Sequence, residues 1–252
     1  MSDVYQLASI GMLDGKQRLE AIGLNAASAS LPGYRRHVVV ATAFQAALAA
    51  EHEPTPASTD VTKLLASPLA DSARTVLHHV DLRAGAITAT GRALDLAIES
   101  ENAFFMLTDG ARTWLTRAGS FRVNAEGMLV GEGGLRVVGT QGDVHVPNGE
   151  VEVAPDGRIL HDGVAVAALQ LFEPNDRVAL QAGPGSLLSA PAGVHVVDTA
   201  RVRSGALEAS NTDAGREMLG LMMLSRQFES LSRIVQGYDE ALGRAIQELG
   251  EG

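Results

Sequence analysis

The sequence predicts a mainly β protein with helical ends, in which an antiparallel β-domain lies between N- and C-terminal helices that pair as a coiled coil. Apolar residues recur every three or four positions near both ends of the chain. Short apolar runs separated by Asp-Gly and Asn-Gly pairs fill the middle. We therefore expect an N-terminal helical segment at 1–50, a linker at 51–75, a β-domain at 76–203 and a C-terminal helix at 204–252.

The N-terminal helix is predicted by one apolar face whose members lie three or four residues apart, as one side of an α-helix requires. This face comprises Val4, Ala8, Met12, Gly15, Leu19, Ile22 and Ala26. Pro32-Gly33 ends this helix or bends the chain sharply. The stretch 38–50 is rich in Ala and Val and fits either a helix or an extended strand.

The linker is indicated by a change of composition after residue 50. Pro54, Pro56 and Pro68 stand among serines and threonines there. Proline and short polar residues disfavour regular structure, so we expect little of it between residues 51 and 75.

The β-domain is predicted by apolar runs typical of short strands. These runs are Asp95–Ser100, Phe104–Thr108, Thr113–Arg117, Phe121–Val123, Arg136–Val138, Val151–Val153 and Val164–Phe172. The turn signals between them are Asp109-Gly110, Glu126-Gly127, Asn148-Gly149, Asp156-Gly157 and Asp162-Gly163. Asp-Gly and Asn-Gly favour tight hairpins because these residues tolerate positive φ, so the sheet should be mostly antiparallel.

The C-terminal helix carries the most regular pattern in the chain, a heptad stripe preceded by a capping segment at 211–213. The stripe consists of Leu221, Leu224, Phe228, Leu231, Val235, Tyr238, Leu242, Ala245 and Leu249. Gly220, Gly237 and Gly243 lie off it, and each costs an isolated helix about 1 kcal/mol. The helix should therefore be marginal alone and pair with the N-terminal helix on assembly. An ordinary core helix is the alternative interpretation.

Composition and motifs argue against several classes of function. A net charge of −10 without a cluster of Lys and Arg disfavours nucleic-acid binding. The chain has no Cys, and its seven His show no HExxH spacing, so we expect neither a metal site nor a Cys nucleophile. Gly131-Glu132-Gly133-Gly134 matches no phosphate-binding loop, and no GxSxG motif occurs. We predict no catalytic, cofactor or metal site, and no enzyme activity.

The sequence predicts neither a membrane-spanning segment nor a cleaved signal peptide. No apolar run approaches the length of about 20 residues that spans a bilayer. The N-terminus has no basic start followed by an apolar stretch, so we expect no cleaved signal peptide.

Three segments together resemble the flagellar basal-body rod and hook proteins. The first runs from Gly11-Met12-Leu13 through Gln17-Arg18-Leu19 to Pro32-Gly33-Tyr34-Arg35-Arg36. The second includes Leu94–Ile98, Phe104-Phe105, Thr116–Phe121 and Asn124–Val130. The third is Gly205–Asn211, followed by Ser225–Glu229, which looks most like the proximal rod subunit. The chain departs from the family where Leu24-Asn25-Ala26-Ala27-Ser28 replaces Asn-Asn-Leu-Ala-Asn.

The resemblance implies a structural subunit of the proximal rod, the helical drive shaft that transmits torque from motor to hook. Its partners are copies of itself, other rod subunits and the flagellar type III export apparatus, which delivers it uncleaved to the periplasmic rod. The terminal helices then form the inner layer and the β-domain the outer layer. We expect these assembly residues: Met12, Leu19, Ile22, Leu221, Leu224, Phe228, Leu231, Val235, Tyr238, Leu242 and Leu249.

Other functions stay open at this point. Within the family, the distal rod subunit is the first alternative, and a hook protein follows. Outside it, a secreted β-domain enzyme would show two carboxylates in a cleft. A partner-binding adaptor would instead form a small closed oligomer through its helical tail.

Overall fold

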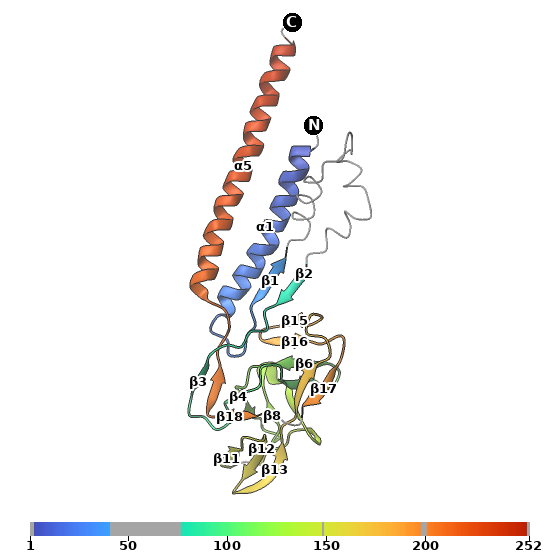
Figure 1. The fold of residues 1–252 in the computed structure, drawn as a ribbon, viewed down its shortest axis with the longest axis vertical. Coiled ribbons are helices and arrows are strands. Elements are labelled where there is room, and N and C mark those ends of the chain that lie inside the picture. Colours follow the sequence, from blue (N-terminus) through green and yellow to red (C-terminus); the bar gives the residue numbers. More distant parts are fainter. Residues whose placement is uncertain (1–2, 41–76, 148, 198–200, 251–252) are drawn as a thin grey trace. The chain divides into compact units, whose positions relative to one another are not determined.

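The computed structural model describes residues 3–40, 77–147, 149–197 and 201–250 (Figure 1). The chain divides into two compact units. Unit 1 comprises residues 1–24, 38–78 and 214–252, and unit 2 comprises residues 25–37 and 79–213. The predicted linker at 51–75 lies outside the described residues.

Unit 1 contains most of helix α1 (Asp3–Ser28) and all of helix α5 (Ala214–Gly250). The two helices are antiparallel neighbours, because a Cβ on Gly11 would contact Leu231 and one on Gly15 would contact Phe228. At the other end of the pair, a Cβ on Gly220 would lie 3.3 Å from the Ile22 side chain. The predicted pairing of the terminal helices is thus confirmed. Gly220, which we expected to lie off the seam, is part of it.

The first helix ends before Pro32-Gly33, where the sequence predicted its end. α1 ends at Ser28, and strand β1 (His37–Val40) shows that the described beginning of the stretch 38–50, which fitted either a helix or a strand, is extended. Gly33 adopts φ +68 after Pro32, which turns the chain, and the β-branched Val38–Val40 then favour a strand. α5 begins at Ala214 because residues 202–208 form two strands instead of the first turns of a helix.

Most strands of the fold belong to unit 2, and most of the sequence between residues 77 and 208 alternates between short strands and turns. After β1 the strands are β2 (Leu77–Val80), β3 (Ile87–Ala89), β4 (Leu96–Ile98), β5 (Phe104–Thr108), β6 (Thr113–Thr116), β7 (Arg122–Val123), β8 (Leu129–Val130), β9 (Arg136–Gly139), β10 (Gly142–Asp143), β11 (Val151–Val153), β12 (Arg158–His161), β13 (Val164–Ala168), β14 (Leu171–Pro174), β15 (Gln181–Ala182), β16 (Leu187–Ser189), β17 (Val194–Val197), β18 (Val202–Ser204) and β19 (Ala206–Glu208). A 3-10 turn, η1 (Glu132–Gly134), precedes β9.

The largest sheet has the order β15-β16-β6-β5-β9-β8-β7, with β14 also pairing with β5 and β17 pairing with β14. Strands β11, β12 and β13 form a separate antiparallel sheet. β1 pairs with β2, β18 with β4, and β19 with β3. The pairings whose direction is defined are antiparallel, which confirms the predicted sheet type.

The predicted hairpin signals lie at positive-φ turns. Gly110, Gly127 and Gly157 have φ of +95, +78 and +85, and Asp162-Gly163 has positive φ at both residues. Asn148 lies outside the described residues. The run Val164–Phe172, predicted as one strand, is divided between β13 and β14, and Leu169 between them forms a separate bridge to Gly139.

The core of unit 2 lies on both faces of the main sheet. Alternate residues of β5 separate into two clusters, with Phe105 and Leu107 in the larger cluster and Phe104 and Met106 in the smaller. In the larger cluster, the rings of Phe105 and Phe121 meet edge to face at 5.0 Å. The two residues of the motif Phe104-Phe105 therefore pack into the two core clusters on opposite faces of the sheet.

Candidate functional site

Part of the stripe on α5 faces α1, because Cβ atoms on Gly15 and Gly11 would contact Phe228 and Leu231. Leu224 is only 5% exposed, and Phe228, Leu231, Val235 and Tyr238 are half-buried. Leu221, at the beginning of the stripe, is 37% exposed. The side chains of Leu242 and Leu249 lie outside the described part of the chain.

On α1, part of the predicted apolar face turns toward α5. Ile22 is half-buried and lies against Gly220, but Met12 and Leu19 are 36% and 41% exposed. Gly15, a member of the predicted face, is buried against α5, and Gly11, which was not expected there, also faces it. A Cβ on Gly15 would lie 2.7 Å from Cζ of Phe228, so the absent side chain makes room for the ring. The Gly11-x-x-x-Gly15 spacing, opposite the bulky side chains of the α5 stripe, was the signal that could have placed Gly11 on the face that contacts α5.

The role of Met12 and Leu19 in assembly stays a prediction, and their exposure leaves them available to another chain. A second exposed apolar group, which the sequence reasoning missed, lies on α5 outside the seam. It consists of Met218, Leu219, Met222 and Met223, which are between 53% and 70% exposed. Large adjacent apolar side chains of this kind are typical of surfaces that bind a partner.

Within unit 2, the three segments that carry the family resemblance meet at a buried ion-pair cluster. Arg35 and Arg117 both contact the Glu208 carboxylate, at 2.6 Å and 2.7 Å. All three residues are at most 2% exposed. Their segments follow α1, follow β6 and precede α5 in the chain, so the cluster ties together three parts of the sequence that are far apart.

Several hydrogen bonds hold the Arg117 side chain in the cluster. Its guanidinium donates to Glu208 through Nε and to the carbonyls of Ser100 and Ala103 through Nη1, and it lies 5.7 Å from the Phe104 ring centroid. Burial lowers the pKa of Arg117, and attraction to Glu208 offsets only part of this effect. Arginine keeps its charge even so, and two guanidiniums share one carboxylate.

Glycines allow the backbones around the cluster to approach closely. A Cβ on Gly33 would lie 2.2 Å from the backbone N of Ala118, and Gly33 donates its N–H to the Glu208 carbonyl. A Cβ on Gly119 would lie 1.7 Å from the Leu96 carbonyl oxygen. No side chain fits at either position, which explains the Pro-Gly and Ala-Gly of the two motifs.

Two asparagines complete the connection, and the sequence reasoning assigned neither this role. Asn25 is 1% exposed and exchanges two hydrogen bonds of 2.8 Å with the backbone of His37, while the Tyr34 hydroxyl donates to it at 3.1 Å. Asn211 accepts from the backbone N of Arg36 at 2.7 Å and donates to the carbonyls of Asp81 and Arg83. Asn211, predicted only as part of a helix cap, thus joins three backbone segments.

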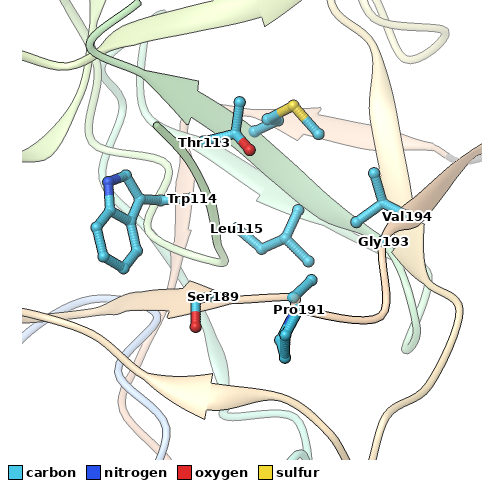
Figure 2. Close-up of a pocket in the computed structure, with 9 residues that line it drawn as sticks. Thr113, Trp114, Leu115, Ser189, Pro191, Gly193 and Val194 are labelled. Carbon is cyan, nitrogen blue, oxygen red and sulfur yellow. The ribbon is translucent and has the colours of Figure 1, made fainter. Parts of the chain in front are cut away.

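The described part of the chain holds no group of three His, Asp or Glu placed to bind a metal ion. The pocket in Figure 2, between β5, β6 and the segment before β17, is lined without a titratable side chain. None of the helices in the ranges described has the length and apolarity needed to cross a bilayer.

The fold and the site define a structural assembly subunit with an antiparallel β unit, paired terminal helices and a buried anchor between their flanking segments. Comparison with protein families agrees. The model of the flagellar basal body rod FlgEFG protein C-terminal region matches residues 203–248, and that of the flagellar hook protein FlgE/F/G D1 domain matches residues 97–161.

Individual relatives extend the match over the whole chain. The flagellar basal-body rod protein FlgF of Rhizobium meliloti is 33% identical over 174 residues, which cover 67% of this chain and 72% of the relative. FlgF of Mesorhizobium japonicum is 26% identical and covers 99% of both chains. FlgG of Bacillus subtilis is 27% identical and covers 94% of this chain and 95% of its own.

The chain belongs to the flagellar basal-body rod protein family. It is a structural rod subunit, similar to the FlgF type of the proximal rod, and the family is not one of enzymes. The function predicted from the sequence is thereby confirmed. Membership of the rod family also implies assembly with other rod subunits.

Proposed function

We propose that this subunit joins copies of itself and other rod subunits in a helical tube, the proximal part of the shaft that transmits torque from motor to hook. The terminal helices line the inner layer of this tube, and unit 2 forms its outer layer. We further propose that the flagellar type III apparatus exports the chain to the periplasm without cleavage.

The observation that carries this proposal is the paired terminal helices with apolar surface left over. After α1 and α5 have paired, Met218, Met222 and Met223 remain more than half exposed. A helix pair that still exposes such side chains gains stability when a further helix covers them, at roughly 25 cal/mol per Å² of apolar surface. The contacts that hold a shaft together can therefore form between neighbouring pairs.

The buried cluster of Arg35, Arg117 and Glu208 supports the transmission of torque. Load applied to a terminal helix reaches the chain segments next to it, 25–37 and 205–213. Both segments are held in unit 2 by the ion pairs of Glu208 with Arg35, at 2.6 Å, and with Arg117, at 2.7 Å. None of these three residues is more than 2% exposed. Separating a buried ion pair is costly, because it leaves each charge with neither water nor its partner.

A distal rod subunit is the second candidate, because FlgG of Bacillus subtilis matches 94% of this chain. Deletion of the gene, followed by motility assays and electron microscopy of basal bodies, separates the two candidates. A rod that stops close to the motor, without hook and filament, supports the proximal position. A longer truncated rod supports the distal position, and complete basal bodies in swimming cells refute both.

A further inference from the structure

Helix α5 is apolar on all sides near its beginning. Residues 218–224 read Met-Leu-Gly-Leu-Met-Met-Leu, with no polar side chain among them. With about 3.6 residues per turn, the side opposite the seam residues Leu224 and Phe228 carries positions 218, 219, 222 and 223. The four residues there are more than half exposed and form what we call the methionine patch: Met218, Leu219, Met222 and Met223. A helix that is apolar all round is typical of a buried position, so we expect this part of α5 to be covered on both faces in the assembled protein.

The same face of α5 becomes polar directly beyond the methionine patch. Arg226, Glu229 and Arg233 occupy it over the next turns, and all three are exposed. This is the side-chain pattern expected of a helix face in contact with water. The exposed apolar surface is therefore a local site in the first turns of α5 and not a general property of the helix.

Thioether groups make up most of the methionine patch. Three of the seven Met in the chain lie within residues 218–223. Met223 is 70% exposed, whereas Met106 is 9% exposed within the smaller core cluster of unit 2 and Met128 is half-buried. An oxidant in solution therefore reaches the sulfur atoms of the patch more easily than those in unit 2.

Methionine reacts with peroxides through its sulfur. The sulfur lone pair attacks one peroxide oxygen, the O–O bond breaks, and that oxygen stays on the sulfur as a sulfoxide. With hydrogen peroxide, the second oxygen takes up the proton of the transferred oxygen and leaves as water. The sulfur is oxidised by two electrons, and the peroxide is reduced by the same two. An apolar thioether thus becomes a polar group that accepts hydrogen bonds.

We propose that Met218, Met222 and Met223 form an oxidation-sensitive site, at which a peroxide modifies the free subunit and prevents its assembly into the rod. The inference rests on the proposed function, in which a neighbouring helix pair covers this face. Burial of a polar sulfoxide without a hydrogen-bond partner is unfavourable, so the modified face stays in water and the neighbour does not bind. In an assembled copy the same neighbour keeps peroxide away from the sulfur atoms. The site therefore excludes oxidised subunits from new rods and leaves finished rods intact.

Peptide mass spectrometry of the full-length subunit, treated with hydrogen peroxide, tests the chemistry. Met218, Met222 and Met223 should each gain one oxygen atom at least about tenfold faster than Met106, whose oxidation must wait for a rare opening of the core. In purified basal bodies the same three residues should react no faster than Met106. Equal rates at Met106 and Met223 in the free subunit, or unchanged rates in basal bodies, would overturn the inference.

Two variants, each expressed as the only copy in cells, test the effect on assembly. Met218→Gln/Met222→Gln/Met223→Gln introduces polar side chains of similar length, as oxidation would, and should lose rods and motility. Met218→Leu/Met222→Leu/Met223→Leu keeps the face apolar at nearly the same volume, cannot be oxidised, and should form the rods that the Gln variant lacks. Loss of rods in the Leu variant as well would refute the inference, because polarity would then not decide assembly.

A matched control places Gln on the same face beyond the patch. Arg226→Gln/Glu229→Gln/Arg233→Gln should form rods, and their loss would show that the effect is not specific to the methionine patch and would refute the inference. Rods from the patch Gln variant would also refute it, yet leave the proposed function intact. Absence of the wild-type chain from basal bodies would instead refute the proposed function.

Circular dichroism of the purified Gln variant shows whether it folds. If it does not, Met223→Gln alone takes its place, because this side chain is the most exposed of the three. Co-expressed with the wild-type chain, Met223→Gln should be depleted in basal bodies relative to the cell extract. Equal incorporation of the two chains would overturn the inference.

Discussion

Substitution of Gly15 offers the sharpest test of the helix pair. A methyl group added to a helical glycine should stabilise the protein where the space around it is empty and destabilise it where another side chain fills that space. In Gly15→Ala, the new Cβ would lie 2.7 Å from Cζ of Phe228 and 3.1 Å from Cε2, so the ring must move. Gly23 lies on the same helix with nothing within 4 Å, so Gly23→Ala serves as the matched control.

The magnitudes follow from two competing terms. Ala stabilises a helix by about 1 kcal/mol relative to Gly, which Gly23→Ala should show in full. Gly15→Ala gains the same amount but loses about 1–3 kcal/mol to overpacking against the ring. We therefore expect Gly15→Ala to be about 1–3 kcal/mol less stable than Gly23→Ala.

Amide hydrogen exchange on the purified subunit measures this difference, because it reports the local opening free energy of the helices. Protection of the α5 amides around Phe228 and Leu231 should fall in Gly15→Ala and rise or stay equal in Gly23→Ala. If amide protection in α5 rises equally in both variants, the contact between Gly15 and Phe228 is absent in the free subunit. Pairing would then occur only on assembly, as we expected from the sequence, and our reasoning from the single chain would be refuted.

The remaining predictions concern the helix seam, the buried anchor and two exposed ion pairs. Phe228→Ala should weaken rod assembly and motility, since truncation of a buried Phe costs about 3–5 kcal/mol and this ring is half-buried; normal rods would count against the seam. Glu208→Gln leaves two buried guanidiniums without a carboxylate and should cost about 3–5 kcal/mol in urea unfolding. Glu99→Gln, which breaks only the exposed pair with Arg203, should cost less than about 1 kcal/mol, and equal losses would contradict the role of burial. Asn211→Ala removes three hydrogen bonds and should lower the free energy of unfolding by about 1–3 kcal/mol; an unchanged urea midpoint would refute its bridging role. The Arg83 hydrogen bonds lower the pKa of Asp81 in the folded state, so its contribution is present above the unfolded value of 3.8 and lost as pH falls through the lower folded pKa. Asp81→Asn should therefore destabilise the protein at neutral pH and have little effect in strong acid, as unfolding curves at both pH values will show.

Local signals in the sequence predicted the strands and turns well. β5 and β11 begin and end where their apolar runs do, because each run is bounded by residues that favour turns. The stretch 38–50 was left open between a helix and a strand, because its Ala and Val suit both. Pairing of β1 with β2, a contact between distant segments, decides for the strand at His37–Val40.

The site was harder to predict, because its residues meet only in the folded chain. Glu208 and Arg117 are 91 residues apart, and no spacing rule joins them, although both lie in the motifs that resemble the family. The predicted face of α1 included Gly15 and Ile22, which face α5, and also Met12 and Leu19, which are exposed. Counting apolar residues could not separate these positions, whereas the ring of Phe228 needs the space that Gly15 leaves.

Quantitative mass spectrometry of purified basal bodies tests the central claim most directly. If the chain is a rod subunit, it should co-purify with basal bodies in a fixed ratio to the other rod subunits and stay bound after washing in high salt. Its absence from complete basal bodies, in cells that express it, would contradict the account.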